Sequence, residues 1–136
     1  MRECKFHATL RFTHSPAPTI APVRVGKLDI QMIHTPGHTP GCRCMLIRPD
    51  SGGPAEALMT GDTLFVGTIG RCDFPYSSPR DFYHSMEKLK KVDEEVLFYP
   101  GHDYGASSSN TLGREKKTNP FLMASTQEQF LQLVRH

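Results

Sequence analysis

Short stretches of alternating apolar and polar residues run along the chain from residue 23 to residue 100. Leu28, Ile30 and Met32 alternate with polar neighbours, and this period of two is typical of a strand with one buried face. The pair Gly26-Lys27 interrupts the pattern and predicts a hairpin over residues 23–33. Three further apolar runs are each expected to form a strand, at residues 45–47, 57–59 and 96–99.

Two stretches carry the spacing of amphipathic helices instead. Within residues 78–91, Phe82, Met86 and Leu89 lie at i, i+4 and i+7 and would form one apolar stripe. The first residue of this stretch is a serine followed by proline, which is a strong signal for a helix start. A second amphipathic helix is expected over residues 125–134. Strands and helices together predict an α/β fold.

Three turns that contain glycine each follow one of the predicted strands, and each carries a potential metal ligand. They are His34-Thr35-Pro36-Gly37-His38-Thr39-Pro40-Gly41, Gly61-Asp62-Thr63 and Pro100-Gly101-His102-Asp103-Tyr104-Gly105. Ligands at the ends of neighbouring strands can converge on one point. Taken singly, such a histidine or aspartate is equally consistent with a turn that its side chain closes.

In this order and spacing, the motifs resemble the metallo-β-lactamase superfamily, and within it the glyoxalase II (hydroxyacylglutathione hydrolase) group and the related persulfide dioxygenases. The likeness spans residues 23–122. The stretches that carry it are the His34–Gly41 repeat, Thr60–Phe65, Gly70–Pro75, Tyr99–His102 and Asn119–Leu122. The resemblance implies an αββα sandwich, of which this chain would form mainly the second half: one mixed sheet with helices on one face.

The resemblance also implies a set of site residues. His38 corresponds to a ligand of one metal, His102 to a ligand of the other, and Asp62 to the carboxylate that bridges both. The implied cofactor is one or two Zn²⁺ ions, with Fe²⁺ or Mn²⁺ as alternatives, since imidazole and carboxylate suit all three. The implied reaction is hydrolysis of a glutathione-type thioester by metal-bound hydroxide, in which Asp62 acts through metal-bound water. Arg71 and Tyr104 fall at positions expected to bind the substrate.

The sequence departs from the family pattern upstream. Family members carry a Thr-His-x-His-x-Asp-His stretch that supplies up to four ligands, whereas residues 1–33 contain only His7 and His14, with no His-x-His. Each metal would then have two protein ligands, one of them shared, where catalytic zinc usually has three. Two alternatives therefore stand beside the hydrolase: a persulfide dioxygenase-like iron enzyme, and a truncated, inactive member that acts as an interaction module. Arg71 is expected either to meet a substrate carboxylate or to pair with Asp73, and His34 to be a turn residue.

Composition and charge limit the kinds of partner and the cellular location that the sequence favours. A net charge of +2 is too small to imply a nucleic-acid partner, and no apolar stretch is long enough to cross a membrane. The four cysteines form no C-x-x-C pair, so reduced thiols are expected rather than a zinc ribbon. Residues 1–22 are expected to be a basic arm of uncertain structure, ahead of a partial domain over residues 23–136. A cytoplasmic location is expected, or an organellar matrix if the arm is a targeting segment.

The predicted helices are sufficient to cover one face of the sheet only. The opposite face would then present alternate residues of the strands at residues 28–32, 45–47 and 96–98, which are apolar. Soluble monomers rarely expose a patch of that kind. The sequence therefore predicts a homodimer, or a complex with a complementing N-terminal half.

Overall fold

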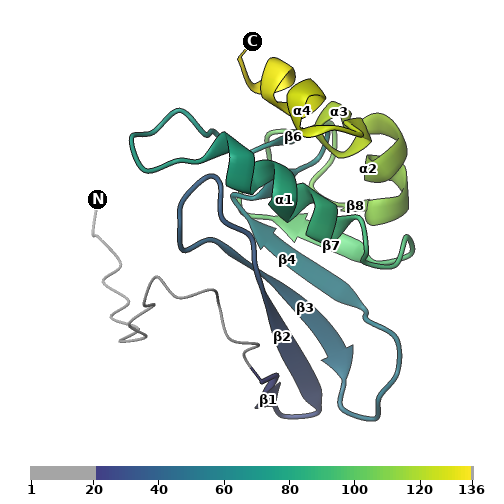
Figure 1. The fold of residues 1–136 in the computed structure, drawn as a ribbon. Coiled ribbons are helices and arrows are strands. Elements are labelled where there is room, and N and C mark those ends of the chain that lie inside the picture. The colour runs from purple at the N-terminus through teal and green to yellow at the C-terminus, as the bar shows by residue number, and fades with distance from the viewer. Residues whose placement is uncertain (1–20, 136) are drawn as a thin grey trace.

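Six strands form one mixed sheet in the computed structural model, which describes residues 21–135 (Figure 1). Their order across the sheet is β1-β2-β3-β4-β7-β8. The bounds of these strands are β1 Val23–Val25, β2 Leu28–His34, β3 Arg43–Pro49, β4 Ala57–Gly61, β7 Leu97–Pro100 and β8 Asn110–Thr111. The arm expected over residues 1–22, with His7 and His14, lies almost wholly outside the described range.

Strand direction brings three strand ends to one edge of the sheet. β1 and β2 form the predicted hairpin, and β2 to β3 and β3 to β4 also pair antiparallel, whereas β4 and β7 pair parallel. β2, β4 and β7 consequently run in the same direction. Their carboxyl ends meet at one edge, as the three ligand-bearing turns require.

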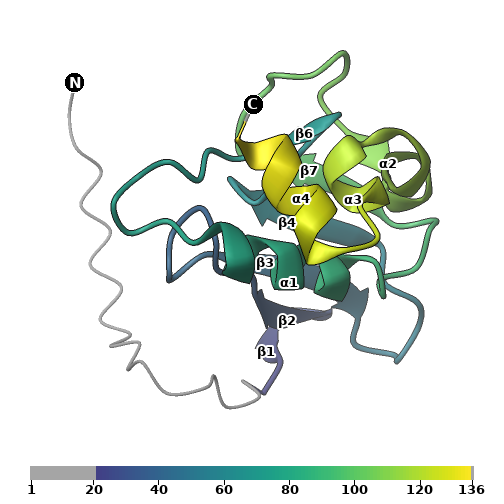
Figure 2. The ribbon, with the colours of Figure 1, turned by 45° about the horizontal axis from the view of Figure 1, so that its top comes forward.

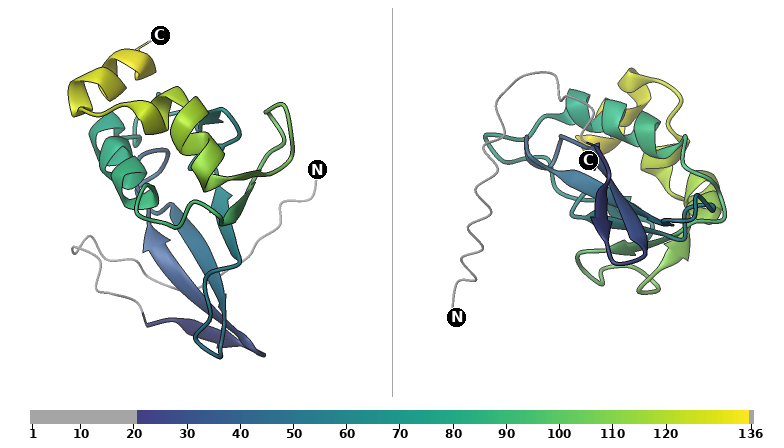
Figure 3. Two further views of the ribbon diagram at one scale, coloured as in Figure 1. Left: turned by 90° about the vertical axis from the view of Figure 1, so that its right-hand side faces the viewer. Right: turned by 90° about the horizontal axis from the view of Figure 1, so that it is seen from below.

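Four helices lie on one face of this sheet (Figures 2 and 3). They are α1 Pro79–Leu89, α2 Leu112–Thr118, α3 Pro120–Met123 and α4 Gln127–Val134. Phe82, Met86 and Leu89 of α1 are fully buried, as their spacing predicted, and pack against Leu58 and Phe98 of the sheet in one hydrophobic core. This arrangement, a mixed sheet with helices on one face, is the predicted fold class.

The face of the sheet away from the helices is apolar and partly exposed. Met59, Leu97 and Tyr99 are 37%, 39% and 41% exposed. Of the predicted strand near Val96–Phe98, Leu97 lies on this face, whereas Val96 and Phe98 are buried on the helical side at 2% and 0% exposure. A shift of one residue in a strand moves every side chain to the other face.

Some elements were not predicted. β5 Leu64–Phe65 and β6 Thr68–Ile69 form a separate antiparallel hairpin. No strand was predicted from the sequence for residues 64–69. The helices α2 and α3 and the short strand β8 were also not anticipated. Among the described residues, no helix has the length and apolarity needed to cross a membrane.

Candidate metal centre

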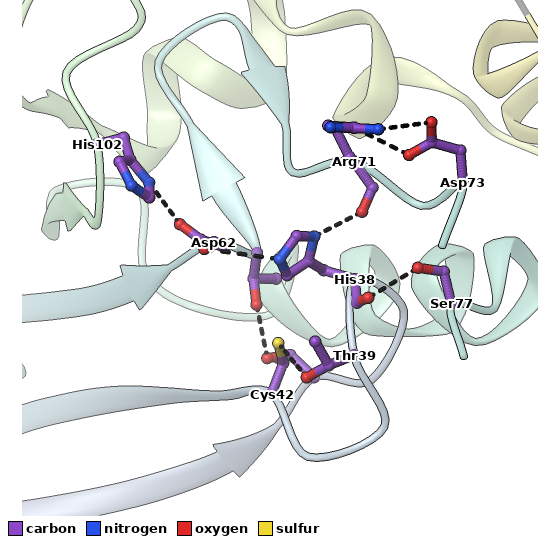
Figure 4. A network of polar contacts seen from close by, with 10 residues as sticks. His38, Thr39, Cys42, Asp62, Arg71, Asp73, Ser77 and His102 are labelled. Carbon is purple, nitrogen blue, oxygen red and sulfur yellow. Dashed lines mark hydrogen bonds and ion pairs between the residues drawn. The ribbon is translucent and has the colours of Figure 1, made fainter. Parts of the chain in front are cut away.

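His38, Asp62 and His102 lie together at the edge where β2, β4 and β7 end (Figure 4). Asp62 follows β4 and His102 follows β7, and these strands are parallel neighbours paired as far as Gly61 and Pro100. The backbone N–H of Gly101 donates to the Gly61 carbonyl at 2.8 Å and extends this pairing. The two turns are therefore held side by side.

Asp62 lies between the two histidines and faces each with a different oxygen (Figure 4). Its Oδ1 is 2.7 Å from Nδ1 of His102, and its Oδ2 is 3.6 Å from Nε2 of His38. The side chains of His38, Asp62 and His102 are 17%, 35% and 48% exposed, so the site opens to solvent on the His102 side. The three ligands that the resemblance implied are thus neighbours.

The turn that carries His38 is fixed by the beginning of α1. The Ser77 hydroxyl donates to the His38 carbonyl at 2.8 Å, and the Ser85 hydroxyl donates to the Pro36 carbonyl at 2.7 Å. A Cβ at Gly37, where φ is +150°, would collide with Phe82. The position therefore needs glycine both for its backbone conformation and for the close approach of the helix.

His34, the first histidine of the repeat, has a different role. Its Nε2 lies 2.8 Å from the Pro40 carbonyl, so it bridges the two ends of its own turn. The expectation that His34 is a turn residue rather than a ligand agrees with this contact.

A backbone carbonyl sets the tautomer of His38. Nδ1 of His38 lies 2.6 Å from the carbonyl oxygen of Arg71 and must carry its proton there, since a carbonyl only accepts. The lone pair of a neutral imidazole is then on Nε2, which faces Asp62. Contacts of this kind orient metal-ligating histidines. Sequence reasoning missed this role, because no side-chain pattern marks a carbonyl; the one hint is Gly70, whose close approach to the Asp62 backbone leaves no room for a Cβ.

The Arg71 side chain points away from the histidine and pairs with Asp73. Its Nε and Nη2 donate to the two carboxylate oxygens at 3.0 and 2.9 Å, which lowers the pKa of Asp73. Of the two predicted contacts of Arg71, the ion pair is the one present. The neighbouring Cys72 is half-buried, and this burial raises the pKa of its thiol, so it lacks the character of an activated nucleophile.

Aromatic rings flank both histidines. Phe74 meets the His38 ring edge-on with centroids 5.6 Å apart. On the other side Tyr104 stacks on His102 at 4.9 Å with nearly parallel planes, and Phe65 packs edge-on against both rings. Tyr104 is 69% exposed and lies at the rim of the site. Sequence reasoning had assigned no role to Phe65 or Phe74.

The imidazole nitrogens and carboxylate oxygens suit ions such as Zn²⁺, Fe²⁺ or Mn²⁺. In this structure, however, the donor atoms form two separate pairs. Among the described residues, no group of three or more His, Cys, Asp and Glu side chains is placed to hold one ion. Instead His38 and His102 each form a pair with a different oxygen of Asp62. The Nδ1–H of His102 donates directly to Oδ1 of Asp62, so it is the set of donors, one carboxylate between two imidazoles, that suits the shared part of a two-metal site.

The sequence matches no protein-family model, but it is similar to several curated proteins. It is 41% identical over 99 residues to the uncharacterized protein ML0493 of Mycobacterium leprae, with 72% of this chain and 42% of that protein aligned. Over 117 residues it is 33% identical to Glyoxylase B2 of Dictyostelium discoideum (80% and 38% aligned). It is also 34% identical over 107 residues to human mitochondrial persulfide dioxygenase ETHE1 (78% and 40%). The chain thus spans about two fifths of the length of these relatives.

Solved structures give the same result. The fold matches a metallo-β-lactamase from Staphylococcus aureus with a TM-score of 0.79 and 30% identity, over 87% of this chain and 38% of that one. It matches ETHE1 from Myxococcus xanthus with a TM-score of 0.73 and 34% identity, over 85% and 48%. These proteins place the chain in the metallo-β-lactamase superfamily. The superfamily likeness of the sequence is therefore confirmed, while its restriction to a C-terminal half without the histidine motif stays a prediction.

A third similar structure is that of TTHA1623, which was solved in a di-iron-bound form. It matches with a TM-score of 0.58 and 33% identity, over 78% of this chain and 48% of that one. A protein with this fold thus holds metal ions in a solved structure.

Proposed function

We propose that this chain supplies the shared part of a two-metal centre in a thioester hydrolase of the glyoxalase II type, acting on a hydroxyacylglutathione. The observation that carries the proposal is the position of Asp62, whose two carboxylate oxygens each face one imidazole. The similarity to Glyoxylase B2 supports the choice of substrate class.

His38 through Nε2, His102, and Asp62 through both oxygens are the residues that would hold the metal. The chemistry that a bound Zn²⁺, Fe²⁺ or Mn²⁺ supplies at such a site is the activation of water near neutral pH and polarisation of a carbonyl. The chain contributes a histidine fixed in one tautomer by the Arg71 carbonyl, and an edge of the sheet that holds the two ligand turns side by side.

The overall reaction consumes one water, breaks the acyl C–S bond and releases a carboxylic acid and a thiol. Tyr104 and Arg71 are our candidates for substrate contacts, since both lie at the rim. The Tyr104 ring is largely exposed and extends the aromatic wall beside His102. The Arg71 guanidinium is 69% exposed and lies 4.7 Å from the Phe74 ring centre, so it remains open to an anionic group of the substrate.

A second candidate is an iron-dependent persulfide dioxygenase. Human ETHE1 and ETHE1 from Myxococcus xanthus are both 34% identical to this chain, and TTHA1623 binds two irons. Imidazole and carboxylate donors suit Fe²⁺ as well as Zn²⁺, so the donor types do not separate the two. The metal that the protein retains and the substrate that it consumes do.

The test is metal analysis of protein purified without added metal, followed by two assays. We expect bound Zn²⁺, Fe²⁺ or Mn²⁺ and hydrolysis of an acylglutathione thioester that chelation abolishes and metal restores, because the nucleophile would be metal-bound water. Iron together with oxygen consumption on glutathione persulfide would favour the dioxygenase. An empty protein without either activity would favour the inactive interaction module. Thioesterase activity that persists undiminished after metal removal would overturn the proposal.

A further inference from the structure

Glu115 of α2 is a fully buried carboxylate that no cation neutralises among the described residues. It is 1% exposed and accepts three hydrogen bonds from neutral donors. These come from the backbone N–H of Gly67 at 3.0 Å, the Asn119 side chain at 2.9 Å and the Asn110 side chain at 2.8 Å. Burying a polar group is costly unless its hydrogen bonds are made, so Glu115 depends on a fixed arrangement of donors around it.

Two of these donors tie the carboxylate to the hairpin of β5 and β6. Gly67 is at the tip of this hairpin, with φ at +82°. Asn119, which is fully buried, also donates to the carbonyl of Thr68 at 3.1 Å and lies 3.5 Å from that of Phe65. Glu115 and Asn119 therefore hold the hairpin through hydrogen bonds at its tip and its second strand. The α3 helix, which follows Asn119, lies beside β6 (Figures 1 and 2).

The same hairpin is linked to each residue of the candidate metal centre, either by contact or along the chain. Asp62 lies just before it in the chain. The Phe65 ring packs against His102 with centroids 5.9 Å apart, and Gly105 lies too close to Val66 to carry a Cβ. Beyond β6, the chain reaches Arg71, whose carbonyl holds the His38 ring.

We propose that Glu115 and Asn119 are positioning residues for the metal centre, acting through the hairpin of β5 and β6. The inference rests on the proposed function only in naming the metal as the ligand. The contacts predict that the hairpin, the Asp62 turn and the His38 ring move together. Loss of the Gly67 hydrogen bond should therefore weaken the hydrogen bond that Nδ1 of His38 makes with the Arg71 carbonyl.

The first test uses Glu115→Gln, which keeps the size of the side chain but turns an amide N–H₂ toward groups that also donate. We expect its affinity for Co²⁺ to fall at least about tenfold, as outer-shell changes commonly do, with an altered visible spectrum of the bound ion. Leu89→Ala is the control, because Leu89 is also fully buried but is the last residue of α1, outside the helix and the hydrogen bonds that hold the hairpin. We expect it to lower the melting temperature and leave Co²⁺ affinity within about twofold. Equal affinities in the two variants would overturn the proposal.

A second measurement keeps the wild-type protein and does not depend on the variant folding. Coupling between two sites is reciprocal, so Co²⁺ should slow hydrogen exchange of the Gly67 amide if the hairpin positions the ligands. Unchanged exchange at Gly67 with Co²⁺ bound would overturn the positioning role.

A third readout separates this inference from the proposed function. If wild type binds no Co²⁺, the proposed function fails, but nitrogen NMR of the His38 ring still reports its tautomer. In Glu115→Gln we expect the Nδ1–H signal of His38 to broaden or to exchange faster with water. A signal identical to that of the wild type would show that Glu115 only stabilises the fold.

Discussion

Asp62 uses both carboxylate oxygens, whereas His38 and His102 each contact it once. If each histidine holds one metal, Asp62→Ala should remove a ligand from both ions and His38→Ala or His102→Ala from one. We therefore expect Asp62→Ala to lower the metal content, measured by elemental analysis, more than either histidine variant. Asp50→Ala, in the exposed loop after β3, is the control and should retain the wild-type content. Equal metal in all of these proteins would exclude the assignment.

Cys44, another single residue, allows a prediction about how the stability of the fold depends on pH. The side chain is fully buried, and burial raises the pKa of its thiol from 9.0 to about 11. The folded state therefore favours the protonated thiol. This contribution to the free energy of unfolding is present below pH 9 and is lost as pH rises from 9 toward 11.

We expect urea midpoints of the wild type to fall over that range more than those of Cys44→Ala, because other groups titrate in both proteins alike. At neutral pH, iodoacetamide should label the partly exposed Cys42 well before Cys44, as mass spectrometry of digests can show. Parallel pH profiles for the two proteins would contradict the raised pKa.

At the scale of elements, the turns that carry the ligands are held by close backbone approach. A Cβ at Gly70 would overlap the Asp62 carbonyl and come within 3.2 Å of His38 Nδ1. Gly70→Ala should therefore displace the Asp62 turn and cost about 1–3 kcal/mol of stability, the usual range for overpacking. It should also weaken Co²⁺ binding in a titration.

Gly41→Ala is the control for this change. Gly41 lies in the His38 turn, yet a Cβ there would meet no atom within 4 Å. Its stability and Co²⁺ affinity should stay close to wild type. A Gly70→Ala protein that behaves like Gly41→Ala would show that the approach of residue 70 does not constrain the centre.

Element boundaries with local signals could be predicted from the sequence. The alternation in β2, the glycine at residue 26 and the apolar stripe of α1 each specify structure within a few residues. Ser78 caps α1 as predicted and accepts from the Asp81 N–H at 3.3 Å. The hairpin of β5 and β6 gave no comparable signal, because strands of two residues are too short to show a period. It is held by Glu115 and Asn119, which are about 50 residues away in the sequence.

The candidate site was predictable for a different reason. Its three ligands stand in turns with distinctive short motifs, so the sequence brought His38, Asp62 and His102 forward as one group. What it did not contain was the support of those ligands. The Arg71 contact is made by a backbone carbonyl, which every residue has. Phe65 and Phe74 have no sequence context that distinguishes them from aromatic residues of the core. Such contacts depend on tertiary packing alone.

At the scale of the whole molecule, the two faces of the sheet differ sharply. The helical face contains the core, including Leu58 and Phe98 at full burial. The other face, here called the open face, has no helix over it among the described residues (Figure 3). Its apolar residues include Ile30, Met32, Met45, Ile47, Met59, Leu97 and Tyr99. Patches of apolar surface beyond a few hundred Å² are rare on soluble monomers.

We expect a second copy of the chain to cover this open face. Its central side chains are apolar, and two such sheets can pack face to face about 10 Å apart in an isologous dimer. Met59→Lys, which puts a charge in the middle of the face, should shift the protein toward monomer in sedimentation at micromolar concentration. Met123→Lys makes the same change on α3, where Met123 is 56% exposed on the helical side, and should leave the association unchanged. Because the buried face would be large and apolar, dissociation should accompany unfolding, and the midpoint should rise with protein concentration. A wild-type chain that sediments as a compact, cooperatively folded monomer and binds no hydrophobic dye would contradict this expectation.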